Sequence, residues 1–249
     1  MEIQFAIPSY QRPKKLKDQT LSFLERNQVP RQNITIFLRN QEQANLYKED
    51  VSGYKIVITD TPNLIQKRNF ITKYFPLGTK IISIDDDIKD IQFLDKNKNF
   101  LSTIERLFKQ IEREGCSAFG FYPTTTTNNF YLKERVAFGL QYICFACFGF
   151  LNQGLQIPDC HNLGDDHFYS LYMYEKEGKT VRYEGASIKT TYFSKGGLSE
   201  ARKNGDLKGA FEALQQKYPH LIKLVEKKNG RPDLSFSRLK REFKPLLEE

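Results

Sequence analysis

The chain has 249 residues, enough to bury one large core, and its 39% hydrophobic and 27% charged residues are typical of a globular protein. The formal net charge of +8 favours an anionic partner, nucleic acid first, although a solvated lysine-rich surface is the alternative. No apolar run reaches 18 residues and the N-terminus lacks a secretory signal, so we expect no membrane partner.

The first 120 residues alternate short apolar runs, which predict strands, with segments of helical period. Strands are expected at residues 3–9, 34–39, 54–60, 80–84 and 116–122. Helices are expected at residues 15–27, 42–49, 63–75 and 102–114, the last opening with the capping-box pair Ser102 and Glu105. Repeated strand–helix–strand units predict an α/β fold, with a mainly parallel sheet covered by helices on both faces.

The second half continues with a buried strand in the apolar run 142–150, a helix at 165–178 and strands across 180–193. Asp165 and Asp166 begin that helix, where negative charge suits the helix dipole. From residue 205 onward helical signals and basic residues dominate. We therefore expect a main domain at 1–204 and a basic, helical C-terminal extension at 205–249 packed on it.

Four cysteines lack the spacing of a metal site or a disulfide framework: Cys116, Cys144, Cys147 and Cys160. Cys144 and Cys147 have CxxC spacing, but in a strand they would point to opposite faces. Buried structural thiols, and a reducing location in the cytoplasm, are therefore expected.

Polar residues follow several expected strands at the point where each strand ends. Ser9 to Arg12 follow the first strand, Arg39 and Asn40 the second, Asp60 the third, and Asp85–Asp87 the fourth. Because ligands bind outside the carboxyl ends of the strands in such sheets, these residues predict a site at that edge.

The three aspartates at 85–87 repel one another unless a cation, a helix terminus or water compensates their charge. One interpretation is that they cap the next short helix or face water. The other is an oxygen half-site for Mg²⁺ or Mn²⁺, whose remaining positions water and phosphate oxygens fill. Since side chains alternate along a strand, Asp85 and Asp87 would share one face and act as a D-x-D pair.

Further candidates for the site lie outside this acidic run. Asp165-Asp166 provides either a helix cap or a general base for an acceptor hydroxyl, whereas His167 is expected to pack. Arg68 either pairs a phosphate by two hydrogen bonds or lies on the surface. Lys195, beside two glycines, belongs either to a phosphate-binding loop or to a flexible one. Neither GxxxxGK[ST] nor GxGxxG occurs, which argues against a P-loop or a dinucleotide site.

The motifs IPSYQRP (7–13), IDDD (84–87) and GDD (164–166) together resemble nucleotide-sugar glycosyltransferases of the GT-A fold. Within that group, the added segments ITIFLRNQEQANLY (34–47) and RNFITKYFPLGTK (68–80) are similar to the TET/JBP-associated glycosyltransferase family. This family occurs in phages and in kinetoplastids that make base J, and is implicated in glycosylating hydroxymethylated pyrimidines in DNA. The resemblance is strongest over residues 3–91 and weaker over 164–203.

The resemblance implies a GT-A, Rossmann-like mixed sheet with a helical C-terminal region. It also implies that Asp85 and Asp87 bind Mn²⁺ or Mg²⁺, and that Asp165 or Asp166 is the base of an inverting reaction. A C-terminal histidine ligand, common in GT-A enzymes, has no clear counterpart beyond His220. The donor-binding residues that it implies are Pro8, Ser9, Arg12, Arg68, Asp85, Asp86 and Lys195.

The expected function is transfer of a hexose, with glucose favoured, from a UDP-sugar to a hydroxymethylpyrimidine in DNA. One alternative keeps the enzyme but gives it a glycan or polysaccharide acceptor. Another is a non-catalytic nucleic-acid-binding module with structural acids, against which the shared edge of acids and Arg68 argues.

Overall fold

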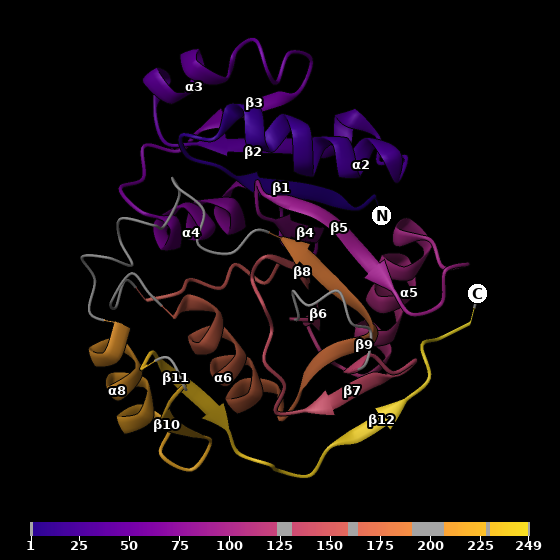
Figure 1. Ribbon diagram of the computed structural model, residues 1–249, viewed down its shortest axis with the longest axis vertical. Helices are drawn as coiled ribbons and strands as arrows, with labels where there is room; N and C mark the ends of the chain where they lie inside the picture. Colours follow the sequence, from indigo (N-terminus) through magenta and orange to yellow (C-terminus); the bar gives the residue numbers. More distant parts are fainter. Residues whose placement is uncertain (1, 124–130, 159–163, 191–206, 228–229, 249) are drawn as a thin grey trace.

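The computed structural model describes residues 2–123, 131–158, 164–190, 207–227 and 230–248 (Figure 1). The strands of its main sheet are β1 (Gln4–Pro8), β2 (Ile34–Leu38), β3 (Lys55–Ile58), β4 (Lys80–Ile84), β5 (Ile88–Phe93), β6 (Ala118–Tyr122), β7 (Val136–Gly139), β8 (Cys147–Leu151), β9 (Thr180–Thr190) and β12 (Glu242–Lys244). A separate hairpin consists of β10 (Ile222–Glu226) and β11 (Pro232–Phe236). The helical segments are α1 (Pro13–Lys15), η1 (Leu16–Leu21), α2 (Ser22–Arg26), η2 (Arg31–Asn33), α3 (Gln41–Tyr47), α4 (Leu64–Tyr74), α5 (Phe100–Arg113), α6 (Asp165–Glu177) and α8 (Leu207–Lys217).

The main sheet has the strand order β12-β7-β9-β6-β8-β4-β1-β2-β3, and β5 pairs with β9 outside this path. The run β4-β1-β2-β3 is parallel throughout. Only β5, β7 and β8 run against the common direction of the described strands in this sheet. The predicted mixed, mainly parallel sheet flanked by helices is confirmed.

Alternating side chains of the central strands divide the core into two layers. Phe5 and Ile7 of β1 pack with α2, α3 and α5 on one face of the sheet, whereas Ala6 packs with α4, α6 and α8 on the other. Figure 1 shows the helices separated by the sheet in this way. Helices on both faces leave the ends of the strands accessible, so a site can form there.

Asparagine side chains begin three helices. Asn40, Asn63 and Asn99 each accept a hydrogen bond from the backbone N–H three residues later, at the starts of α3, α4 and α5. The predicted capping box at Ser102 is therefore wrong, since Asn99 caps α5 and the helix begins at Phe100. The Asn63 cap fixes where α4 starts, and with it the position of Arg68.

Strand β5 was not predicted from the sequence. β5 begins directly after Asp87 and pairs with β9, with Ile91 opposite Ile188. Exposed Lys89 and Asp90 interrupt the alternation of apolar and polar residues in β5, so the period-two pattern that predicts a strand is missing. As a result, Asp85–Asp87 lie in a tight connection between two strands rather than at an open strand end.

The C-terminal region differs from the predicted series of helices. Helix α8 is present, but the prediction is wrong beyond Lys217, where β10, β11 and β12 follow. Asn-Gly at 229–230 lies between two short apolar runs, a sequence signal for a hairpin. β12 joins the main sheet beside β7, pairing Phe243 with Ala137. The boundary at 204/205 stays a prediction.

Three of the cysteines agree with the expected buried thiols. Cys116, Cys144 and Cys147 are buried, and burial raises the pKa of Cys147 well above its ordinary value. Only Cys147 lies in a strand, so the predicted opposite-face arrangement does not occur: both members of the CxxC pair belong to the same core layer. Cys160 lies outside the described residues. No helix in the described part of the chain has the length and apolar character needed to cross a bilayer.

Candidate active site

The loop after β1 and the turn between β4 and β5 lie against each other at the predicted edge of the sheet. Ser9 Oγ donates a hydrogen bond to Asp86 Oδ2 at 2.6 Å. Arg12 Nη1 lies 3.2 Å from both Asp86 Oδ1 and Asp87 Oδ2. Tyr47 supports this loop, since its hydroxyl accepts from the Arg12 backbone N–H at 2.8 Å and lies 2.7 Å from Ser9 Oγ. The loop therefore supplies one positive charge, shared by two of the three aspartates, and a hydroxyl donor to one of them.

The predicted pairing of Asp85 with Asp87 on one face is wrong. The acidic run forms a turn rather than an extended strand, so strict alternation does not apply. Asp86 and Asp87 share Arg12, and Thr190 Oγ1 at the end of β9 donates to Asp87 Oδ1 at 2.8 Å. Asp85 instead faces Arg68, and it is the most exposed of the three, with 33% of its side chain accessible.

Arg68 joins the two acidic motifs. From the middle of α4 its Nη2 lies 3.2 Å from Asp85 Oδ1, and its Nε lies 3.3 Å from Asp165 Oδ2. Nη1 donates to Ser83 Oγ at 3.0 Å, and the guanidinium stacks over the Phe145 ring at 4.7 Å. Arg68 is thus neither on the surface nor presented to solvent as a free phosphate ligand.

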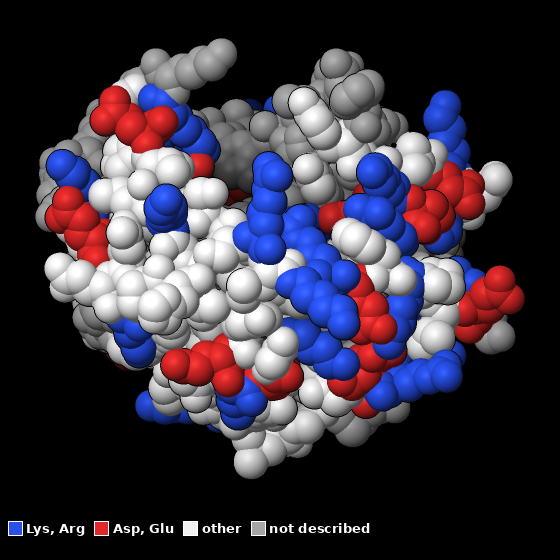
Figure 2. All heavy atoms as spheres, turned by 90° about the horizontal axis from the view of Figure 1, so that it is seen from below, with Lys and Arg blue, Asp and Glu red and all other residues white. Residues whose placement is uncertain are grey.

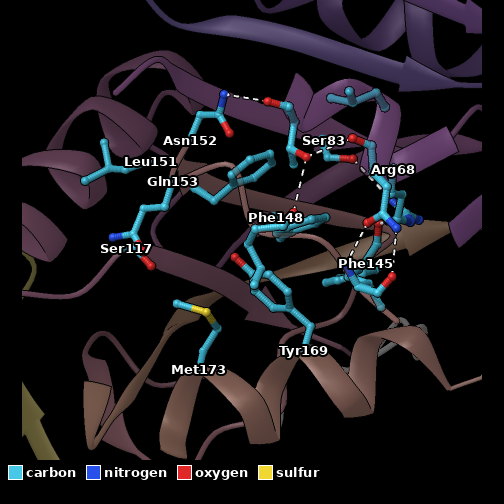
Figure 3. A pocket seen from close by; sticks show the side chains of 16 residues that line it. Arg68, Ser83, Ser117, Phe145, Phe148, Leu151, Asn152, Gln153, Tyr169 and Met173 are labelled. Atoms are coloured by element: carbon cyan, nitrogen blue, oxygen red, sulfur yellow. Dashed lines mark hydrogen bonds between the residues drawn. The ribbon is translucent and has the colours of Figure 1, made fainter. Parts of the chain in front are cut away.

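A narrow cavity of about 30 Å³ lies behind this guanidinium (Figure 3). Phe145, Phe148 and Tyr169 line it together with Met173, and Figure 3 shows Arg68 at one end. Its volume suffices for about one water molecule, not for a nucleotide. We therefore regard it as part of the apolar support that fixes the plane of Arg68.

Burial dominates the ionisation of the acids around Arg68. It raises the pKa of Asp85 to about 7, although the Arg68 charge acts in the opposite direction. Burial also raises the pKa values of Asp86 and Asp165, with Arg12 and Arg68 respectively opposing the shift. Carboxyls of this kind hold a proton more readily than ordinary ones, and shifts of this type are frequent at catalytic sites.

Asp166 differs from its neighbour Asp165. Burial opposes its ionisation, but the neighbouring His167 and a short hydrogen bond from the Tyr142 hydroxyl lower the pKa of Asp166 to about 2. His167 Nδ1 lies 2.9 Å from Asp166 Oδ1, and the His167 ring packs against Tyr142, as expected for a packed histidine. Both Asp166 oxygens are therefore engaged, whereas Asp165 Oδ2 has the Arg68 ion pair but no hydrogen bond.

The β4–β5 turn offers carboxylate oxygens, the type of ligand that Mg²⁺ and Mn²⁺ prefer. Within the described residues, no group of three or more His, Cys, Asp or Glu side chains is arranged to hold a metal alone. Mg²⁺ usually binds one or two carboxylates plus water and substrate phosphates, so a complete protein cage is not required. Asp85 has the accessible oxygens, and Asp87 lies two residues on in the same turn.

Two further residues were predicted to belong to the site, Pro8 and Lys195. Pro8 ends β1 and is buried, so it shapes the loop rather than presenting a surface. Lys195 lies outside the described residues.

The sequence analysis missed Lys67, whose Nζ donates to the Ser9 carbonyl at 2.8 Å and whose burial lowers its pKa to about 8. Its place directly before Arg68, one turn after the start of α4, was the available signal.

Comparison with solved structures shows the same fold. Glucosyl-3-phosphoglycerate synthase from Mycobacterium tuberculosis, in complex with Mn²⁺, UDP and glucosyl-3-phosphoglycerate, aligns with a TM-score of 0.53 and 9% identity, over 98% of this chain and 90% of that one. Mannosyl-3-phosphoglycerate synthase from Rubrobacter xylanophilus aligns with a TM-score of 0.52 and 10% identity, over 99% and 87% of the two chains. No family model and no curated protein sequence matches. The likeness confirms the predicted GT-A fold.

Proposed function

We propose that the chain is a glycosyltransferase that moves a hexose, with glucose favoured, from a UDP-sugar to an acceptor hydroxyl. The observation that carries the proposal is Arg68, which holds Asp85 of the acidic turn and Asp165 of α6 on one guanidinium. A donor-binding acid and a base must lie this close for both to act on one sugar. The crystallised synthase complexes with UDP and Mn²⁺, which share the fold, support the same assignment.

Donor binding is assigned to the loop after β1 and the acidic turn. Ser9 and Arg12 line the nucleotide side, while Asp85 and Asp87 hold Mn²⁺ or Mg²⁺. When bound, the ion offsets the negative charge that develops on the departing diphosphate. Arg12 and Arg68 each contact two acids of the site, and Asp85 is the most exposed acid of the turn, so its oxygens are the ones that a cation reaches most readily. Lys195 remains a candidate partner of the phosphates.

Asp165 is the proposed base, and Asp166 positions the start of α6. The acceptor oxygen forms a bond to the sugar C1, and the C1–O bond to the diphosphate breaks, with its electron pair leaving on the diphosphate oxygen. The acceptor proton passes to Asp165, whose raised pKa suits a proton acceptor. Attack opposite the leaving group inverts the configuration at C1.

DNA carrying a hydroxymethylpyrimidine is the proposed acceptor, supported by the family resemblance and by the charge of +8. The chain leaves β11 at Phe236, whose ring is 5.9 Å from His167, and then runs through Arg238 and Arg241 to β12. Figure 2 shows Lys and Arg side chains gathered in a band on the face below β7 and β12, with acidic side chains between them. The basic side chains of this face suit a polyanionic acceptor.

A glycan acceptor is the alternative, since the synthases that share the fold act on small molecules according to their names. A binding module with purely structural acids is less well supported. Buried acids with raised pKa values would be an unfavourable way to build a scaffold, because a scaffold gains more from apolar packing.

Thermal unfolding with UDP tests the proposal. UDP with Mn²⁺ should raise the melting temperature, because it binds only the folded chain. Asp165→Asn should abolish transfer and retain this UDP shift, while Asp18→Asn, an exposed change on η1, should alter neither. Absence of any UDP shift with Mn²⁺ or Mg²⁺ would overturn the proposal.

A further inference from the structure

A second, larger pocket of about 230 Å³ lies on the other side of Asp165. Ile65 of α4 and Phe168 of α6 form part of its wall, and Ala213 and Leu214 of α8 close it. Asp165 and Lys217 are the only charged residues among those that line it in the described part of the chain. The pocket thus lies between the sheet-bearing body and the C-terminal helix α8, and of these two walls only α8 lies beyond the residues that the sequence resemblance covers.

The pocket is connected to the donor motif through a single side chain. Asp165 belongs to its lining, and the same carboxylate lies 3.3 Å from Arg68, which in turn lies 3.2 Å from Asp85. Asp165 Oδ2 is buried and makes no hydrogen bond within the described residues. Since Oδ2 is buried against Arg68, a hydroxyl group that enters the pocket would meet the 13% of the Asp165 side chain that stays accessible.

The lining limits the kind of molecule that fits. Drug-sized ligands occupy pockets of about 300–1,000 Å³, so about 230 Å³ suits a single ring or a short chain. A sugar ring carries several hydroxyl groups, and apolar walls such as Ile65, Phe168 and Leu214 would leave most of them without partners. A planar ring packs its weakly polar faces against such walls and keeps its polar groups at the edge, so fewer of those groups lose their hydrogen-bond partners.

Lys217 adds a charge preference at the mouth of the pocket. It is exposed, and its Nζ lies 5.0 Å from the centroid of the Phe168 ring. No carboxylate in the described residues forms an ion pair with it, in contrast to Lys227, which pairs with Asp233 at 2.7 Å. An anionic group on the ligand would supply the missing partner.

We propose that this pocket is the acceptor subsite of the transferase. It takes a ring-sized, weakly polar body with a hydroxyl directed at Asp165 and an anionic group beside Lys217. This inference rests on the proposed function, since the transfer step described above supplies the role of Asp165. The chemistry is shared by a free phosphorylated ring compound and by a nucleotide unit of DNA.

Binding of 5-hydroxymethyl-2′-deoxyuridine 5′-monophosphate, followed by ligand-observed NMR with UDP and Mn²⁺ present, tests the subsite. Ala213→Phe places a ring in the pocket and should weaken this binding at least about tenfold. Gln216→Phe makes the same addition on the exposed face of α8 and should change it less than about twofold. Lys217→Met should weaken the monophosphate about tenfold but leave the unphosphorylated nucleoside within about twofold.

Two further arms separate the possible results. A single-stranded oligonucleotide that carries the same base should bind Ala213→Phe more weakly than it binds the wild type. If the wild type binds the oligonucleotide more tightly than the monophosphate, the acceptor comes from DNA. Equal affinities identify a free acceptor. Unchanged monophosphate binding in Ala213→Phe, or free glucose binding as tightly as the monophosphate, would overturn the subsite. The UDP–Mn²⁺ shift in melting temperature is measured on each variant, so loss of the donor site is distinguished from loss of this pocket. If Ala213→Phe does not fold, the exposed Lys217→Met change decides.

Discussion

Replacing Arg68 with methionine tests the contact that joins the two acidic motifs. The Arg68 side chain is only 6% exposed, and it lies 3.2 Å and 3.3 Å from the carboxylates of Asp85 and Asp165. Removing one partner of a buried ion pair costs about 3–5 kcal/mol, because the remaining charge is uncompensated. Asp85 keeps 33% of its side chain in contact with screening water, so we expect the lower end, about 3 kcal/mol.

For a chain of this length, such a loss lowers the melting temperature by roughly 6–12 °C. Arg31→Met is the matched control, since Arg31 is 57% exposed and pairs with Glu25 at 2.8 Å. An exposed pair contributes at most about 1 kcal/mol, so the control should shift the melting temperature far less. Thermal and urea unfolding measure both variants. An equal fall in the two would refute the bridging role of Arg68.

The pH dependence of the same variant gives an independent check. Burial raises the pKa of Asp85 to about 7 from the ordinary 3.8, so its ionisation destabilises the fold above pH 7. That penalty disappears as the pH falls from 7 towards 4. Without Arg68 the pKa of Asp85 rises further, and Arg68→Met should regain part of its lost stability on acidification.

In a double-mutant cycle, Asp165→Asn should reduce the cost of Arg68→Met by about 1–3 kcal/mol, whereas additive losses would contradict the coupling.

Asp87→Asn should abolish transfer and cost about 1–2 kcal/mol of stability through its contact with Arg12; near-normal transfer at saturating Mn²⁺ would contradict the metal assignment. UDP should raise the melting temperature more in Mn²⁺ than in EDTA, because ligands that share a site enhance each other; equal shifts would indicate a metal-independent site. Burial lowers the pKa of Lys67 to about 8 from 10.5, so wild-type stability should rise between these pH values, and Lys67→Met should lack the rise; parallel curves would refute the burial argument. Arg238→Gln with Arg241→Gln should reduce the salt slope of DNA binding by about 1.8, and salt-insensitive wild-type binding would argue for a glycan acceptor.

Local signals were sufficient for most strands and helices of the first half of the chain, with β5 as the exception. The apolar runs of β1, β2 and β4 alternate with helices that start at Asn40 or Asn63, and each signal lies within about ten residues. The location of the site followed from the same pattern, because parallel strands place their carboxyl ends at one edge.

The geometry within the site depended on contacts distant in sequence. Asp85 and Asp87 point to different partners because β5 turns back at once to pair with β9, nearly a hundred residues later. The partner of Arg68 on α6 is likewise 97 residues away, and no local pattern in the helix indicates it. The C-terminal hairpin is a different case, since Asn-Gly at 229–230 was visible and the abundance of Lys and Arg outweighed it in the prediction.

The charges of the site explain why a divalent ion and the donor should bind together. Within the described residues, four carboxylates, those of Asp85, Asp86, Asp87 and Asp165, contact two guanidiniums, those of Arg12 and Arg68. The ammonium of Lys67 is directed at a backbone carbonyl and is itself disfavoured by burial. UDP would add further negative charge to a cluster that already lacks positive charge, and repulsion between like charges at low dielectric opposes its entry. The predicted dependence of UDP binding on Mn²⁺ therefore follows from the described side chains around this turn, without reference to the proteins that share its fold.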